Sequence, residues 1–190
     1  MVGAMNNERE RQIFAQRFGL FIGLATIVML FVAMTSALIV RQGAGNWVNI
    51  NLPYQFWIST AIILLSSVTM FISKKAHKQM EVQRFRIFFW ATFILGVAFI
   101  INQWLGYFAL AKSGFYINGI NSYQYVYVIS MTHLAHVGVG LLILLYTGIK
   151  TSVQKFNPNY HHIIGFISVY WHFVDLLWIF LFIFFQLKFF

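Results

Sequence analysis

The chain is 190 residues long, 60% hydrophobic and 19% aromatic, and only 9% of its residues are charged. A water-soluble fold of this composition would lack the polar surface to cover itself, which excludes an ordinary soluble globular protein and favours a membrane protein. The formal net charge is +9, and the absence of cysteine excludes disulfides, thiolate metal sites and a cysteine nucleophile.

Five apolar stretches are long enough for a helix to cross a bilayer. A hydrocarbon core about 30 Å thick requires about 20 apolar residues of helix. In chain order the stretches cover residues 18–40, 54–73, 87–111, 126–149 and 163–187. Four of them contain no Asp, Glu, Lys or Arg, and the fifth contains only Asp175. We therefore predict an all-α, polytopic membrane protein in which residues 1–190 form a single membrane domain of five transmembrane helices.

Basic residues are distributed unevenly among the segments that separate these stretches. Ten of the 13 Lys and Arg residues lie before the first stretch, between the second and third, or between the fourth and fifth. Arg41, Lys112 and Lys188 lie in the alternate segments. The positive-inside rule therefore places the N-terminus in the cytoplasm and the C-terminus outside. Because topology and attraction to anionic lipid explain the charge, we expect no nucleic-acid binding.

Two of the predicted helices contain polar side chains at membrane depth. Asp175 stands at the centre of the last stretch, and His172 lies three residues before it. An aspartate at this depth costs about 3 kcal/mol on insertion scales, so it requires a partner. His133 and His136 have the same spacing in the fourth stretch, within the segment SMTHLAHVGVG. Residues three apart share one helix face, and each of the two helices therefore presents a short polar stripe.

Three interpretations of the two stripes remain open on the residues alone. The stripes hold helices together through polar contacts, form part of a proton relay, or bind a metal or haem. A relay lacks a continuous line of acids, and two histidines one turn apart do not by themselves bind opposite sides of one porphyrin. We predict no catalytic, cofactor-binding or metal-binding residue in the chain. We predict instead a structural intramembrane polar cluster formed by His133, His136, His172 and Asp175.

Several segments of the second half resemble one known family. The segment VYWHFVDLLWIFLF closely resembles the last-helix signature of subunit III of the haem-copper cytochrome c oxidases, and THLAHVGVG resembles the family's two-histidine element on the preceding helix. INQWLGYFAL and INSYQYVYVISMTHLAH are similar to the family's middle region, with Gln103 and Tyr107 at matching places. The resemblance covers roughly Phe89 to Phe185, and the first two helices only by length and position.

The resemblance implies a non-catalytic, five-helix bacterial subunit III without the two additional N-terminal helices of longer members. Such a subunit packs against the catalytic subunit I, binds phospholipid in a cleft and helps to keep active an oxidase that reduces oxygen to water and pumps protons. Haem and copper are then expected in partner subunits I and II, in the bacterial inner (plasma) membrane, with membership of a respiratory supercomplex left open. The residues agree with this expectation, because a chain with six histidines and no cysteine cannot supply the haem and copper ligands of subunits I and II.

Two positions depart from the family pattern. The first shared helix of the family usually contains a membrane-embedded glutamate, and Ile27 stands at that place. A second frequent glutamate, just before the tyrosine that matches Tyr107, is replaced by Gly106. We therefore do not transfer to this chain any role in lipid anchoring or proton handling that depends on these acids.

The same residues leave alternative functions. Within the respiratory enzymes, the chain could be an accessory subunit of a quinol oxidase or of a nitric oxide reductase. Outside this group of accessory subunits, the chain could be an independent membrane cytochrome or a small ion or proton carrier built around the two polar stripes. Under the subunit III interpretation, we expect His172 and Asp175 to pair with His133 or His136 and to lock the last two helices together.

Overall fold

The structure is a computed structural model that describes residues 2–43, 52–114, 121–153 and 161–189. These residues form five α-helices and no strand: α1 (Val2–Gly43), α2 (Gln55–Lys78), α3 (Val82–Lys112), α4 (Asn121–Val153) and α5 (His161–Phe189). Each helix is long and apolar enough to cross a membrane. The predicted all-α fold with five transmembrane helices is confirmed, while the predicted orientation of the termini stays a prediction.

The helices extend beyond the apolar stretches that predict them. The clearest case is α1, which begins at Val2 although its apolar stretch begins at residue 18. The segment before residue 18 is rich in Glu, Arg and Gln, which are good helix formers, so nothing in it interrupts the helix. The apolar stretch therefore marks the part of a helix that lies in lipid, and its polar flanks prolong the helix into the interface or the solvent.

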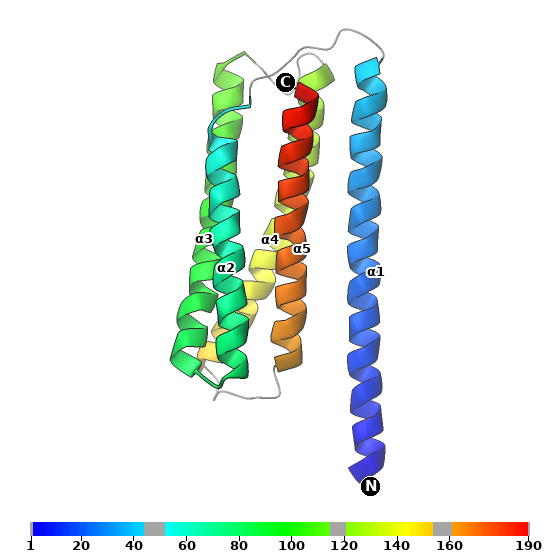
Figure 1. The fold of residues 1–190 in the computed structure, drawn as a ribbon, viewed down its shortest axis with the longest axis vertical. Coiled ribbons are helices and arrows are strands. Elements are labelled where there is room, and N and C mark those ends of the chain that lie inside the picture. Colours follow the sequence, from blue (N-terminus) through cyan, green and yellow to red (C-terminus); the bar gives the residue numbers. More distant parts are fainter. Residues whose placement is uncertain (1, 44–51, 115–120, 154–160, 190) are drawn as a thin grey trace.

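The connection between α2 and α3 is a tight turn. The amide N–H of Gln79 donates to the carbonyl of Lys75 at 3.1 Å, and that of Glu81 donates to the carbonyl of Ala76 at 3.0 Å. Met80, between them, has a φ of 62°, a left-handed conformation that reverses the chain direction. With a connection this short, α2 and α3 form an antiparallel pair that lies side by side along its length (Figure 1).

Helix α1 stands partly apart from the other four helices (Figure 1). Among its described side chains, Leu24 is the first that is buried, and Phe31, Thr35 and Leu38 follow in the C-terminal half. A methyl group built at Gly19 would meet nothing within 4 Å. The N-terminal half of α1 therefore diverges from the bundle. The start of α1 and the end of α5 lie at opposite ends of the bundle (Figure 1).

Helix α5 is positioned by two buried tryptophans. The indole ring of Trp171 fits against glycines of two neighbouring helices: an ideal Cβ would lie 2.8 Å from it at Gly96 of α3 and 3.1 Å from it at Gly140 of α4. Its Nε1 donates to Ser66 Oγ of α2 at 3.0 Å. Trp178, two turns further on, donates to Thr60 Oγ1 of α2 at 3.1 Å. These contacts fix the rotation of α5 about its axis, and with it the direction of the polar residues between the two tryptophans.

Candidate functional site

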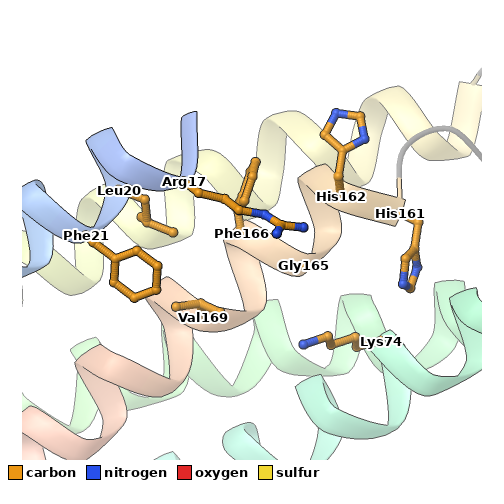
Figure 2. A pocket seen from close by; sticks show the side chains of 9 residues that line it. All are labelled: Arg17, Leu20, Phe21, Lys74, His161, His162, Gly165, Phe166 and Val169. Carbon is orange, nitrogen blue, oxygen red and sulfur yellow. The ribbon is translucent and has the colours of Figure 1, made fainter. Parts of the chain in front are cut away.

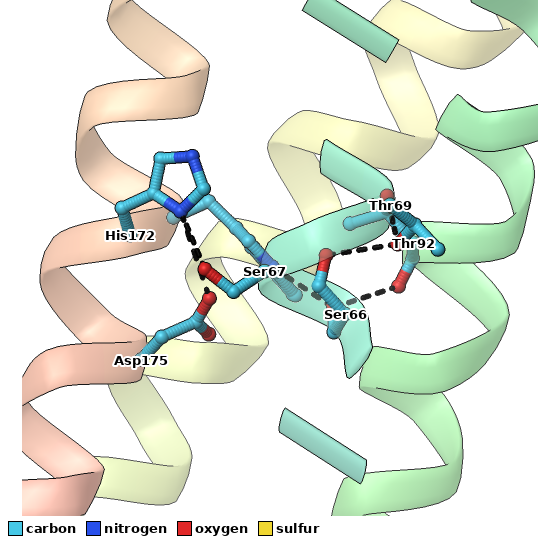
Figure 3. A network of polar contacts seen from close by, with 7 residues as sticks. Ser66, Ser67, Thr69, Thr92, His172 and Asp175 are labelled. Atoms are coloured by element: carbon cyan, nitrogen blue, oxygen red, sulfur yellow. Dashed lines mark hydrogen bonds and ion pairs between the residues drawn. The ribbon is translucent and has the colours of Figure 1, made fainter. Parts of the chain in front are cut away.

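His172 and Asp175 of α5 meet a serine of α2 at membrane depth (Figure 3). His172 Nδ1 lies 2.7 Å from Ser67 Oγ, within hydrogen-bond distance, and 4.0 Å from Asp175 Oδ2. The Asp175 side chain is 4% exposed and the His172 side chain 31% exposed. The three residues therefore form a polar group that is closed on the side of the carboxyl and partly open on the side of the imidazole. We call it the His–Ser–Asp group.

The partner of the α5 pair differs from the one predicted. From the sequence, His172 and Asp175 are expected to pair with His133 or His136 of α4, whereas in the structure they meet Ser67 of α2. The physical reason is the rotation of α5: Trp171 and Trp178 lie four residues before Asp175 and three residues after it, on the same face, and both indoles donate to hydroxyls of α2. The place next to His133 of α4 is taken by the ring of Trp178, at 5.3 Å, so His172 and Asp175 meet Ser67 of α2 instead.

The two histidines of α4 lie in an aromatic layer. His133 is completely buried, and its ring centroid lies 6.3 Å from that of Phe31, 6.0 Å from that of Phe99 and 5.3 Å from that of Trp178. Neither of its ring nitrogens has a hydrogen-bond partner among the described residues. His136 Nδ1 lies 2.7 Å from the carbonyl oxygen of Thr132. The four predicted residues thus divide into two separate pairs, one toward α2 and one within the layer that α1, α3, α4 and α5 share.

Hydroxyl groups of α2 and α3 extend the polar contacts next to the His–Ser–Asp group. Ser66 accepts the indole N–H of Trp171, and the hydroxyls of Thr69 and Thr92 lie 2.9 Å apart (Figure 3). Sequence reasoning missed Ser66, Ser67 and Thr69. The signal that it could have used is their clustering within one turn of an otherwise apolar helix, since polar side chains in such a place bond across helix interfaces.

A cationic cleft opens where α1 diverges from the bundle (Figure 2). Its volume is about 350 Å³. The side chains that line it come from α1, α2 and α5, and they are Arg17, Leu20, Phe21, Lys74, His161, His162, Gly165, Phe166 and Val169. No described carboxylate lines the cleft, so its charge is positive at one end and its remaining described wall is apolar.

An apolar cavity adjoins the cationic cleft. Its volume is about 330 Å³, and it shares Leu20 and Phe166 with the cleft. Its other walls are side chains of α4 and α5, among them Ile143, Ile163 and Trp171. The two spaces are therefore neighbours. Together they offer positive charge beside an apolar surface, the arrangement that suits the head and chains of an anionic amphiphile.

The two positions that depart from the family pattern are occupied by apolar packing. An ideal Cβ at Gly106 would lie 3.2 Å from Cε2 of Phe56, so the phenyl ring fills the space of a longer side chain. Ile27 is partly buried and packs against the hydrophobic core. A carboxylate at residue 106 would therefore have to displace the ring of Phe56.

The arrangement of these groups defines a class of protein before any comparison. It is a polytopic helical membrane protein in which intramembrane polar residues of α2 and α5 contact one another. Within the described residues no group of three or more His, Cys, Asp or Glu side chains lies close enough to hold a metal ion.

Comparison with known proteins identifies the family. The family model described as cytochrome c oxidase subunit III matches residues 15–188. A cytochrome c oxidase subunit 3 of Corynebacterium diphtheriae is 34% identical over 145 residues, which cover 74% of this chain and 70% of the relative. One of Thermostichus vulcanus is 27% identical, over 86% of this chain and 83% of the relative. The chain belongs to the cytochrome c oxidase subunit III family.

Membership of this family confirms the main prediction. The chain is a non-catalytic subunit of an oxidase complex and associates with other oxidase subunits. Its five apolar helices and bacterial relatives make it a multi-pass protein of the plasma membrane.

Proposed function

We propose that the chain docks on the catalytic subunit I of a cytochrome c oxidase that also contains subunit II, and that it stabilises subunit I during turnover. The chain itself then holds no redox centre and no catalytic residue, and haem and copper reside in the partner subunits. Residues 1–190 act as one membrane domain with a cytoplasmic N-terminus. The observation that carries the proposal is the His–Ser–Asp group, because it uses the membrane-embedded polar residues of α5 for a bond to α2.

The surroundings of the α4 histidines support the absence of a haem. A porphyrin needs an axial nitrogen with an open face of several ångströms beside it. The ring of His133 has three aromatic neighbours with centroids between 5.3 and 6.3 Å away, and it is completely buried. With these neighbours around it, the imidazole of His133 serves in packing. The four residues His133, His136, His172 and Asp175 then serve the structure of the subunit, the first two in the aromatic layer and the last two in the His–Ser–Asp group.

The cationic cleft supports a second function, the binding of phospholipid. Arg17 and Lys74 carry the positive charge that a phosphate headgroup requires, and His161 lies at the same end. The adjoining cavity beyond Phe166 has the apolar walls that acyl chains require. A lipid bound there would also fill the gap between the bundle and the diverging half of α1.

The docking proposal is tested by replacing Asp175 with leucine in the complete oxidase complex. Asp175→Leu removes the carboxyl from the His–Ser–Asp group while keeping a side chain of similar size. We expect a lower fraction of subunit III in the purified complex, with the haem content per subunit I unchanged. Leu176→Ala, a change at an exposed neighbouring position of the same helix, is the matched control. Loss of haem from a complex that retains all its subunits would overturn the proposal.

A further inference from the structure

Asp175 is an ionisable group in the middle of a membrane helix without a fixed charged partner. The residue is 3% exposed, and neither of its carboxyl oxygens has a hydrogen-bond partner among the described residues. The nearest basic group is the imidazole of His172, at 4.0 Å. Because burying an unpaired charge is far more costly than burying a neutral carboxyl, gain or loss of one proton here changes the α2–α5 contact strongly.

We propose that Asp175 is a proton-exchange site, connected through Ser67 and His172 to the solution at the cationic-cleft end of the bundle. This activity goes beyond the stabilising function proposed above and does not depend on it. Imidazole is the side chain best suited to pass a proton, because one ring nitrogen accepts a proton while the other releases one. In this group, a single imidazole stands between a buried acid and the partly open side of the helix pair.

The inner part of the path is defined by the contacts of Ser67. Its Oγ lies 2.7 Å from His172 Nδ1, and Figure 3 shows the same hydroxyl next to the carboxyl of Asp175. A proton from water binds His172 Nε2, and the Nδ1 proton passes to Ser67 Oγ. The hydroxyl proton of Ser67 then passes to Asp175 Oδ2. One proton leaves the solution, one carboxylate becomes a carboxyl group, and the imidazole ends neutral with its proton on Nε2; the reverse steps return the proton.

The outer part of the path leads toward the cationic cleft. Val169, which lines the cleft, precedes His172 by one turn of α5, and Lys74 of α2 lies within electrostatic reach of His172. The His172 side chain is 31% exposed, so the described residues do not cover its ring completely. A hydrated phospholipid headgroup in the cleft would bring water to the same place.

Among the described residues, α5 offers no comparable path in the opposite direction. From residue 176 to residue 187, helix α5 contains no ionisable side chain. Trp178 and Phe182, the first aromatic residues on its buried face there, are closely packed. Within the described part of the chain, other charged or imidazole groups on the surrounding helices include Arg17 of α1, His77 of α2, His133 and His136 of α4, and His161 and His162 of α5. The phenols of Tyr107, Tyr127 and Tyr170 donate to Ser130 Oγ, to the carbonyl of Tyr107 and to the carbonyl of His136. Proton access to Asp175 is therefore one-sided.

The first test follows the Asp175 carboxyl band by infrared difference spectroscopy on the complete oxidase complex. The band is assigned as the signal that Asp175→Asn removes, and its shift after transfer to D2O gives the exchange rate. We expect Ser67→Ala and His172→Gln to slow this exchange by about tenfold or more, because each removes one transfer step. Ser66→Ala, which alters the neighbouring hydroxyl that binds Trp171, should leave the rate unchanged. Equal rates in all variants would overturn the proposal.

A second measurement uses the unaltered complex, so that it does not depend on the folding of a variant. The complex is reconstituted in vesicles in one orientation, and the pH is changed on one side at a time. We expect the Asp175 band to respond to the pH on the side of the cationic cleft and not to the pH on the other side. A response from the other side, or a carboxyl that exchanges with neither side, would refute one-sided proton exchange.

Discussion

Ser67 and His172 lie 105 residues apart in the chain, yet the hydroxyl oxygen of one and Nδ1 of the other are 2.7 Å apart. This bond joins the second and last helices at the depth of Asp175. A hydrogen bond in an apolar interior contributes about 1 kcal/mol, and a buried polar group that loses its partner costs about 1–3 kcal/mol. Most of the predictions below concern such contacts between helices.

The first prediction concerns Ser67. Ser67→Ala removes the hydroxyl and leaves His172 without its α2 hydrogen-bond partner, so it should destabilise the subunit by about 1–3 kcal/mol. Thermal dissociation of subunit III from the complex measures this loss. Ser36→Ala, at an exposed position of α1, makes the same chemical change without an interhelical contact and should have no effect. If the two variants dissociate at the same temperature, the Ser67 bond does not stabilise the subunit.

The second prediction concerns the glycines that admit Trp171. Gly96→Ala places a methyl group 2.7 Å from Leu141 Cδ2 and 2.8 Å from Trp171 Cη2, closer than carbon atoms approach. Overpacking of this kind costs about 1–3 kcal/mol. Gly138→Ala, where a Cβ meets nothing within 4 Å, serves as the control and should be tolerated. Unfolding of the purified subunit in detergent and denaturant measures the free energy of unfolding of each variant. Equal values for Gly96→Ala and Gly138→Ala would contradict the close packing of Trp171 against Gly96.

The third prediction compares two neighbouring arginines. Arg86 Nη2 lies 3.0 Å from the carbonyl oxygen of Thr151 and 3.3 Å from that of Ser152, at the C-terminal end of α4. A cation that binds the last carbonyls of a helix stabilises it, and we expect Arg86→Met to cost about 1–2 kcal/mol.

Arg84 provides the matched control for Arg86. It forms an exposed ion pair with Glu81 at 3.2 Å. Such pairs contribute between about 0 and 1 kcal/mol, so Arg84→Met should have little effect on unfolding in denaturant. A larger loss for Arg84→Met than for Arg86→Met would show that the cap at the end of α4 does not operate.

The fourth prediction concerns the lipid in the cationic cleft. Arg17→Gln combined with Lys74→Gln removes both permanent charges of the cleft and should lower the anionic phospholipid that remains bound after extensive detergent washing. Native mass spectrometry counts the retained lipids. Arg84→Gln, a loss of charge outside the cleft, should retain as much anionic lipid as the unaltered protein. Unchanged retention in the double variant would place the lipid elsewhere.

The number and order of the helices were predictable because lipid imposes a simple requirement on each crossing. An uninterrupted apolar stretch of sufficient length meets that requirement whatever its neighbours are. The polar residues His133, His136, His172 and Asp175 were recognisable for the same reason, since each stands out in such a stretch.

The partners of these residues were not predictable, because hydropathy does not determine how each helix is rotated about its axis. The rotation of α5 depends on Trp171 fitting against Gly96 and Gly140, which belong to two other helices. Ser67 gains its importance only from that rotation. The cationic cleft depends on the divergence of α1, a matter of packing that no single stretch of residues encodes.

The most direct test of the account is to tag this chain in its native membrane, extract it gently, and record the co-purifying subunits together with the reduced-minus-oxidised haem spectrum. The account predicts that a larger haem-containing subunit co-purifies, and that the haem spectrum stays with this larger subunit when the tagged chain is stripped away. A chain that purifies alone, or one that keeps a haem of its own after stripping, would contradict it.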